Sequence, residues 1–219
     1  MEKIAIYDLD RTITRIGTFT PFLIFATSRA HWRKALLPFY FLAMPAYAAG
    51  LITRRTLKQW GFMLAVGRKT APDRISELAF AYAEHVLTTN LNKHVTIQIA
   101  KDRAEGFVLV IATAAPEIYA TEIGAGLGFD HVLATRQSRW PDGDISHWIE
   151  GENCYGKAKL QAIEEWLPGN RESFTIRFYS DHHTDIDVFD WCDEPIATNP
   201  NTKLQALAHQ RGWRIMARS

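Results

Sequence analysis

Two aspartates, Asp8 and Asp10, are the residues of this sequence best suited to do chemistry. They follow a short apolar segment, residues 3–7, whose composition predicts a β-strand. Side chains two residues apart in an extended chain point the same way, so both carboxylates can face one substrate. One carboxylate can attack a phosphorus atom while the other transfers the proton of the leaving oxygen. The spacing therefore favours nucleophilic chemistry on a phosphate ester.

A second acidic pair, Asp181 and Asp185, follows another predicted strand that ends at Tyr179. In an open α/β sheet, ligands bind at the edge where the parallel strands end. Binding of a hard cation such as Mg²⁺ beside a phosphate requires a collection of oxygen ligands. The two pairs together therefore predict a Mg²⁺ site at this edge.

The elements that must position these acids alternate between strand-like and helix-like segments. This alternation predicts an α/β fold, a Rossmann-like parallel sheet with helices on both faces. The predicted strands are residues 3–7, 107–112, 130–135, 174–179 and 195–198. The predicted helices between them are residues 95–105, 117–127, 156–167, 186–191 and 202–211.

Residues 17–94 interrupt this rhythm, because they contain several helical patterns and no convincing strand. We interpret them as an α-helical cap inserted into a catalytic core formed by residues 1–16 and 95–219. The segment Trp140–Trp148 has a turn signal between aromatic residues and predicts a β-hairpin.

Four motifs in order resemble those of the haloacid dehalogenase superfamily. Asp8-Leu-Asp-Arg-Thr is similar to its first motif, Asp-x-Asp-x-Thr, and Thr113, at the end of a strand, is similar to its second. Cys154-Tyr-Gly-Lys-Ala-Lys159 resembles the region of the third-motif lysine, and Asp181-His-His-Thr-Asp185 resembles the fourth motif. The resemblance covers essentially the whole chain. It is strongest to the phosphoserine-phosphatase-like branch, whose helical cap follows the first motif.

The resemblance implies a role for each of these positions. Asp8 would be the nucleophile that forms an aspartyl-phosphate, and Asp10 would protonate the leaving alcohol and then activate water. Mg²⁺ would be held by the Asp8 carboxylate, the Asp10 backbone carbonyl and Asp181, with Asp185 nearby. Thr113 and a lysine would balance the charge of the phosphoryl group, the main electrostatic task in such transfers.

Two lysines are candidates for the residue that balances the phosphoryl charge. The sequence also departs from the family pattern at two further positions. Lys159 fits the Cys-x-Gly-x-x-Lys spacing and is preferred, whereas Lys157 fits the register of the phosphoserine phosphatases proper. Ser180 stands where the fourth motif usually has glycine, which slightly weakens the expected match of the backbone at this position. Ala115 stands where related chains often have serine, which removes one phosphate donor.

The net charge of +1 hides an uneven distribution. Residues 29–74 hold nine basic residues and one acidic residue, a formal charge of +8, and the remainder of the chain carries −7. Such asymmetry suggests that the two parts meet different partners.

The two cysteines, Cys154 and Cys192, have no CxxC spacing, so a reducing, cytoplasmic location is the simpler prediction. An apolar share of 47% excludes a disordered chain.

An apolar stretch, residues 35–52, is 18 residues long, carries no formal charge and is flanked by basic pairs. A single membrane span would separate Asp8 from Asp181, which the family resemblance excludes. Two interpretations remain. The stretch is either the packed core of the cap, or it lies in a membrane interface with its basic flanks on anionic headgroups.

These observations lead to a Mg²⁺-dependent phosphomonoester hydrolase as the expected function. If the cap contacts an anionic membrane, at its inner face, the substrate would be a lipid phosphate such as phosphatidylglycerophosphate or lysophosphatidate. The alternative is a small soluble phosphomonoester such as phosphoserine. A non-catalytic membrane or protein adaptor is disfavoured because all motif acids are present. No nucleic-acid-binding motif occurs, so no nucleic-acid partner is expected.

Overall fold

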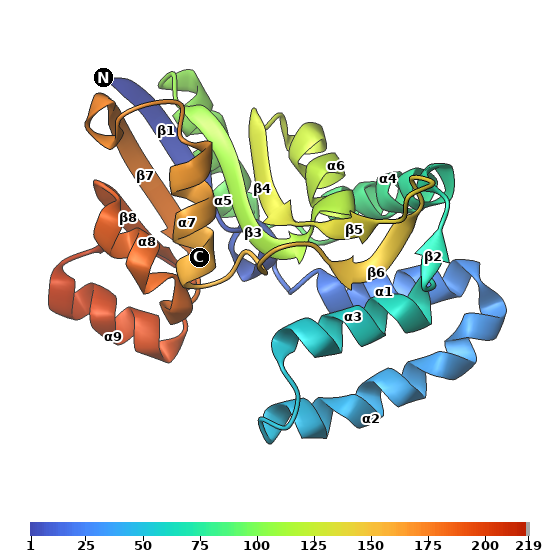
Figure 1. Ribbon diagram of the computed structural model, residues 1–219. Coiled ribbons are helices and arrows are strands. Elements are labelled where there is room, and N and C mark those ends of the chain that lie inside the picture. The colour runs from blue at the N-terminus through green and yellow to red at the C-terminus, as the bar shows by residue number, and fades with distance from the viewer. Residues whose placement is uncertain (218–219) are drawn as a thin grey trace.

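A parallel six-stranded sheet forms the centre of the molecule in the computed structural model, which describes residues 1–217 (Figure 1). The strand order is β4-β3-β1-β7-β8-β9, and every neighbouring pair is parallel. The predicted α/β fold is therefore confirmed. The strands are β1 Glu2–Tyr7, β3 Val108–Pro116, β4 His131–Thr135, β7 Phe174–Ser180, β8 Glu194–Thr198 and β9 Arg214–Met216.

Helices cover both faces of the sheet because its central strands are apolar on both sides. In β1, Ala5 and Tyr7 point into one buried cluster and Ile4 and Ile6 into the other. The first cluster is closed by α5 Lys93–Ala104 and α6 Glu117–Leu127. The second is closed by α7 Lys157–Trp166, α8 Ile186–Trp191 and α9 Thr202–Arg211.

The segment between β1 and α5 is mainly helical, as predicted. Its α-helices are α1 Phe19–Arg29, α2 Leu37–Ala48, α3 Arg54–Ala65 and α4 Pro72–Thr89. A short π-helical stretch, Leu9–Ile13, precedes α1, and a 3-10 helix, His31–Leu36, precedes α2.

The expectation that this segment contains no strand is wrong at one place. The two-residue strand β2, Lys69–Thr70, pairs antiparallel with β6, Ile145–Ile149. A two-residue strand is too short to show periodicity, so the sequence pattern did not reveal it. The partner β6 forms the predicted hairpin with β5, Gln137–Arg139. Through the pairing of β6 with β2, the hairpin contacts the helical segment.

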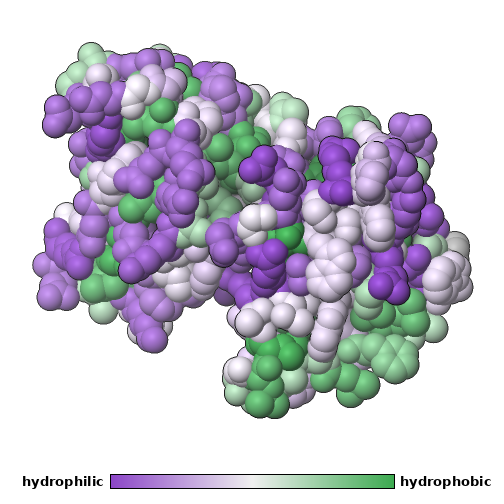
Figure 2. All heavy atoms as spheres, in the orientation of Figure 1, coloured by the Kyte–Doolittle hydropathy of each residue, from purple (hydrophilic) through white to green (hydrophobic). Residues whose placement is uncertain are grey.

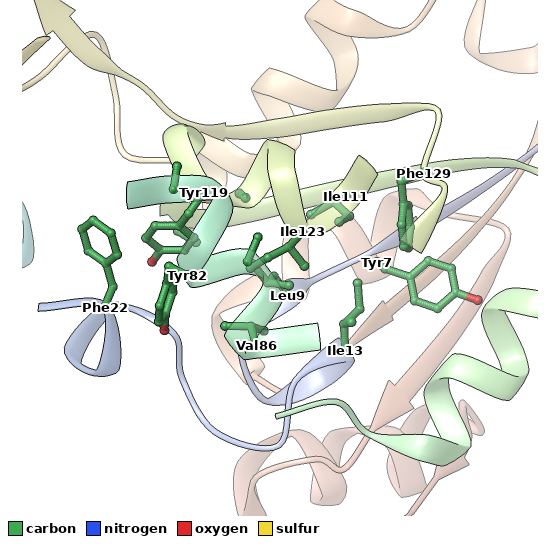
Figure 3. Packing of buried hydrophobic residues seen from close by; sticks show 14 of the residues in the cluster. Tyr7, Leu9, Ile13, Phe22, Tyr82, Val86, Ile111, Tyr119, Ile123 and Phe129 are labelled. Carbon is green, nitrogen blue, oxygen red and sulfur yellow. The ribbon is translucent and has the colours of Figure 1, made fainter. Parts of the chain in front are cut away.

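The apolar core runs without a break from the sheet into this helical segment. Figure 3 shows Phe22 of α1 and Tyr82 of α4 beside Tyr119 of α6. The two helices α4 and α6 pack closely at Gly126, where a Cβ would clash with a methyl carbon of Leu87. Part of the inserted segment therefore rests firmly on the sheet layer.

The apolar stretch of residues 35–52 is divided between the 3-10 helix, α2 and the turn that follows. Within α2 only Tyr40 is buried, and most of its large side chains are exposed. The packed-core interpretation therefore fails for most of this stretch. Across residues 1–217, every helix is too short or too polar to cross a membrane.

Candidate active site

The strand register brings the motif residues to one edge of the sheet. Tyr7 at the end of β1 is level with Ile111 in β3 and with Tyr179 in β7. Asp8 follows Tyr7 directly, and its backbone N–H donates to the carbonyl of Tyr179 at 2.9 Å. Thr113 and Asp181 lie two residues beyond their own register positions. The predicted meeting of these three residues follows from parallel pairing alone.

A buried lysine connects the acids of the first and fourth motifs. The ammonium group of Lys159 lies 2.9 Å from Oδ1 of Asp8 and 2.6 Å from Oδ2 of Asp185. The Ser180 hydroxyl also donates to Oδ2 of Asp185, at 2.7 Å. Serine in place of the usual glycine therefore supplies a hydrogen bond that fixes the acid beside the lysine. Lys157 is exposed at the start of α7, so only Lys159 lies at the acids.

Burial and mutual repulsion dominate the electrostatics of this cluster. Burial alone would lower the pKa of Lys159, but Asp185 and Asp8 outweigh it and raise that pKa, so the lysine stays charged. Burial raises the pKa of Asp8, and Lys159 opposes this rise. Burial, together with the nearby Asp8, raises the pKa of Asp181 to about 8. The carboxylates therefore need more positive charge than one lysine to be ionised together.

Asp10 is held by Thr18, the residue that directly precedes α1. Its Oδ1 accepts hydrogen bonds from the backbone N–H and the hydroxyl of Thr18, both at 2.7 Å. The Thr18 hydroxyl lies 3.1 Å from the phenol of Tyr119. These contacts bind one oxygen of Asp10 and leave the other without a partner among residues 1–217. The carboxylate is therefore oriented through Oδ1, with Oδ2 left for a further contact.

Thr113 is buried at the end of β3, where its hydroxyl accepts a hydrogen bond from the backbone N–H of Ala115 at 3.1 Å. This backbone donor orients the Thr113 hydroxyl, but it does not replace the side-chain donor that a serine at position 115 would supply. Thr113, Asp8, Asp10 and Lys159 all line one cavity of about 440 Å³.

Among the cavity residues that were not predicted, two basic ones belong to α3 of the inserted segment. The Lys58 ammonium donates to the carbonyl of Ala114 at 2.5 Å and to Oδ1 of Asn153 at 2.9 Å. Burial, aided by Arg54, lowers the pKa of Lys58 to about 7. Arg54 also lines the cavity and lies over the ring of Tyr155. Their only signal in the sequence was the basic character of residues 29–74.

Apolar and aromatic side chains form much of the cavity wall near the insert. They come from the loop before α1 and from α1, α2 and α3. These residues are Ile16, Phe19, Pro21, Tyr40, Tyr47 and Leu57.

The acidic side chains can hold a cation only together with a backbone carbonyl oxygen as a further ligand. Within residues 1–217, no three Asp, Glu, His or Cys side chains are grouped as metal ligands. A set made of two carboxylates, Asp8 and Asp181, and the Asp10 carbonyl does not require three such side chains. Oδ1 of Asp185 is buried without a partner in this part of the chain.

The two histidines of the fourth motif are not placed as a metal site. The centroids of their rings lie 4.4 Å from each other. His182 accepts a hydrogen bond from the backbone of Thr184, and His183 contacts the Asn201 amide. Burial lowers the pKa of His182, so it favours the neutral ring.

The haloacid dehalogenase-like hydrolase family model matches residues 5–190, which include every motif acid described above. The chain belongs to this family. The resemblance inferred from the four motifs is therefore confirmed, and an adaptor without enzymatic activity is no longer a competing interpretation.

Known proteins and solved structures extend the comparison. A probable phosphatase of Mycobacterium tuberculosis is 25% identical over 232 aligned residues, which cover 97% of this chain and 74% of that protein. A protein of unknown function from Bordetella pertussis has a TM-score of 0.88 at 22% identity and covers 99% of this chain and 98% of its own. A phosphoserine phosphatase solved as a phospho-aspartyl intermediate analogue has a TM-score of 0.62 at 18% identity, covering 100% and 94%.

The family match and the phosphatase-named relatives identify the chain as a HAD-type phosphatase. Its fold is that of the phosphoserine-phosphatase-like enzymes.

Proposed function

We propose that this phosphatase is Mg²⁺-dependent and hydrolyses phosphomonoesters through an aspartyl-phosphate on Asp8. The observation that carries the proposal is the buried contact of 2.9 Å between Asp8 and Lys159, at the floor of the cavity. A carboxylate at the end of a central strand, facing a cavity with a permanent positive charge beside it, is suited to attack an anionic phosphate.

Four side chains would carry the chemistry in this proposal. An oxygen of Asp8 forms a bond to phosphorus while the ester oxygen leaves. Asp10, oriented by Thr18, gives its proton to that oxygen and then takes one from the water that attacks the phosphoryl group. This second step releases inorganic phosphate and regenerates the Asp8 carboxylate. Thr113 and Lys159 would bind the phosphoryl oxygens.

Phosphatases of this family generally use Mg²⁺, and the acids of this site fit such an ion. The carboxylates of Asp8 and Asp181 and the backbone carbonyl of Asp10 would hold it, with Asp185 beside them and engaged with Lys159. The raised pKa of Asp181 supports this set, because a cation would relieve the repulsion between the acids. When bound, the ion supplies positive charge to the phosphoryl oxygens.

In the proposed division of the chain, the core and the cap supply different parts of the cavity. The core, residues 1–16 and 95–219, supplies the motif acids, Thr113 and Lys159. The cap, residues 17–94, supplies the side chains that would meet the organic part of the substrate, including Tyr40 and Arg54.

The cavity wall favours a lipid phosphate, such as phosphatidylglycerophosphate or lysophosphatidate, over an amino-acid phosphate. The acids that line the cavity are Asp8, Asp10, Asp181 and Asp185, and all four have proposed roles in the reaction. A substrate ammonium group would therefore find no carboxylate of its own within the described cavity. Apolar side chains and the cations Arg54 and Lys58 suit an acyl or glycerol chain with a further acidic group. Such a substrate requires peripheral contact with a membrane, at the cytoplasmic face.

A soluble substrate such as phosphoserine is the second candidate, favoured by the likeness in fold to phosphoserine phosphatase. Turnover of p-nitrophenyl phosphate with and without Mg²⁺ tests the reaction type. A parallel assay with phosphoserine and with lysophosphatidate in mixed micelles separates the two substrates. We expect Mg²⁺-dependent turnover and a preference for the lipid. Absence of turnover in all assays would refute the reaction, and a preference for phosphoserine would refute only the lipid assignment.

A further inference from the structure

The helix α2 carries large apolar side chains that no other part of the described chain covers. The exposed fractions are 61% for Phe39 and 73% for Leu42 on the helix, 67% for Trp32 before it and 78% for Leu51 after it. Figure 2 shows hydrophobic side chains gathered over α2, whereas the region of α8 and α9 is mostly hydrophilic. We name Trp32, Phe39, Phe41, Leu42, Met44 and Leu51 the α2 face.

Burial elsewhere does not explain this surface. The helix packs on α1 and α3 and contributes Tyr40 to the core. The opposite side of the same helix, with Pro38 and Pro45 among its residues, is exposed. A contiguous exposed apolar patch on a water-soluble surface usually marks an interaction site.

Basic residues that form no ion pair with a described carboxylate lie near the α2 face in the sequence. Lys34 precedes α2 by three residues, and Arg54 begins α3 after the turn that contains Leu51. Both are exposed, as is Arg29 at the end of α1, and none of the three forms an ion pair with a carboxylate of residues 1–217. The sequence contains no acid between Arg29 and Asp73, so the segment that carries this surface is basic.

We propose that the α2 face is a membrane-binding surface that inserts its apolar side chains into the interface of a bilayer containing anionic phospholipids. Such bilayers offer an apolar layer beneath a negatively charged surface, which matches both features of the patch. A second copy of the chain matches only the apolar side chains. Pairing two α2 faces would also bring the basic residues near each face together, and like charges repel.

The position of α2 also relates the membrane to the catalytic cavity. Tyr40 and Tyr47 lie on α2 and line the cavity that contains Asp8. The helix that touches the bilayer would therefore form one wall of the cavity, and a phosphorylated headgroup could pass along it without leaving the interface. The membrane contact itself does not depend on the proposed catalytic mechanism and would remain if the substrate were soluble.

Co-sedimentation with lipid vesicles tests the proposal directly. One set of vesicles contains phosphatidylcholine alone, and in the other about a third of the lipid is phosphatidylglycerol. We expect binding to the anionic vesicles, weaker binding at high salt and little binding to phosphatidylcholine. The double variant Phe39→Ser/Leu42→Ser should lower the partition coefficient by at least about tenfold, because two apolar side chains no longer insert. Lys34→Gln should lower it by about fivefold.

A matched control is available on the far side of the insert and on the core. Phe80 of α4 and Ile97 of α5 are 60% and 57% exposed, so Phe80→Ser/Ile97→Ser removes similar apolar surface outside the α2 face. This control should bind vesicles like the wild type. Circular dichroism and turnover of p-nitrophenyl phosphate should be unchanged in both double variants, because none of the four residues lines the cavity.

Three results would overturn the proposal. The first is absence of binding to anionic vesicles by wild-type protein that is folded and hydrolyses p-nitrophenyl phosphate, which would leave the catalytic proposal standing. The second is equal loss of binding in both double variants. The third is a concentration-dependent dimer that Phe39→Ser/Leu42→Ser abolishes and that vesicles do not dissociate, which would assign the α2 face to a second copy.

Discussion

Replacing Lys159 by methionine removes the ammonium group that pairs with Asp8 and Asp185 while keeping a side chain of similar length. Lys159 is 2% exposed, and its two ion pairs measure 2.9 and 2.6 Å, so both carboxylates lose a close buried partner. Breaking a buried ion pair by removing one member costs about 3–5 kcal/mol. For a chain of this length, we expect a fall in Tm of about 10 °C in the absence of Mg²⁺.

The loss of stability in Lys159→Met should depend on pH with a defined sign. Burial raises the pKa of Asp8 to about 6 even with Lys159 present, and removal of the lysine, which opposes this rise, should raise it further. A carboxyl group with a raised folded pKa binds a proton more readily in the folded state, so acid favours folding of the variant. The difference in unfolding free energy from wild type should be full near about pH 8 and should shrink as the pH falls toward about pH 5.

Lys157→Met is the matched control, because Lys157 lies on the same helix, two residues earlier, and is exposed. Urea unfolding followed by circular dichroism measures stability, and p-nitrophenyl phosphate turnover measures activity. We expect Lys159→Met to lower kcat/KM by at least about a hundredfold and Lys157→Met to leave both properties nearly unchanged. Equal effects of the two substitutions, or wild-type activity in Lys159→Met, would refute the assignment of Lys159 to the phosphate site.

Three further predictions follow from the site. Thr18→Val removes the hydroxyl bond to Asp10 and should lower kcat about tenfold with little change in KM; an effect on KM alone would contradict a role in orienting the acid. Because burial and Asp8 raise the pKa of Asp181 to about 8, protons compete with Mg²⁺, and the Mg²⁺ concentration for half-maximal activity should rise as the pH falls below about 8. A flat Mg²⁺ requirement over that range would contradict this ligand set. Lys58→Met should raise KM more for substrates with a second acidic group than for p-nitrophenyl phosphate, and an equal rise would remove Lys58 from substrate recognition.

The chemistry of the core could be predicted from the sequence because it depends on strand ends. Asp8, Thr113 and Asp181 each follow a short apolar strand, and parallel register alone brings such positions together. The choice between Lys157 and Lys159 was harder, since both lie at the start of one helix. It depends on which side of α7 faces the sheet, and in the structure that side carries Lys159.

The contribution of the inserted segment could not be predicted in the same way. Lys58 and Arg54 reach the cavity through the packing of α3 against the loop that holds Asn153, a contact between residues nearly a hundred positions apart. The strand β9 was likewise missed, because Arg214–Met216 is too short to carry a periodic signal. The apolar stretch of residues 35–52 was recognised, but its exposure depends on the fact that α2 has neighbours on one side only.

Trapping of the acyl-phosphate is the measurement that tests the central claim most directly. Wild-type protein is mixed with Mg²⁺ and a phosphomonoester, quenched in acid and reduced with borohydride, which converts an aspartyl-phosphate to homoserine. Peptide mass spectrometry then locates the reduced residue. The mechanism proposed for this chain predicts homoserine at Asp8, dependent on substrate and on Mg²⁺. Reduction at Asp10 or at another acid, or turnover with no reducible residue at all, would contradict it.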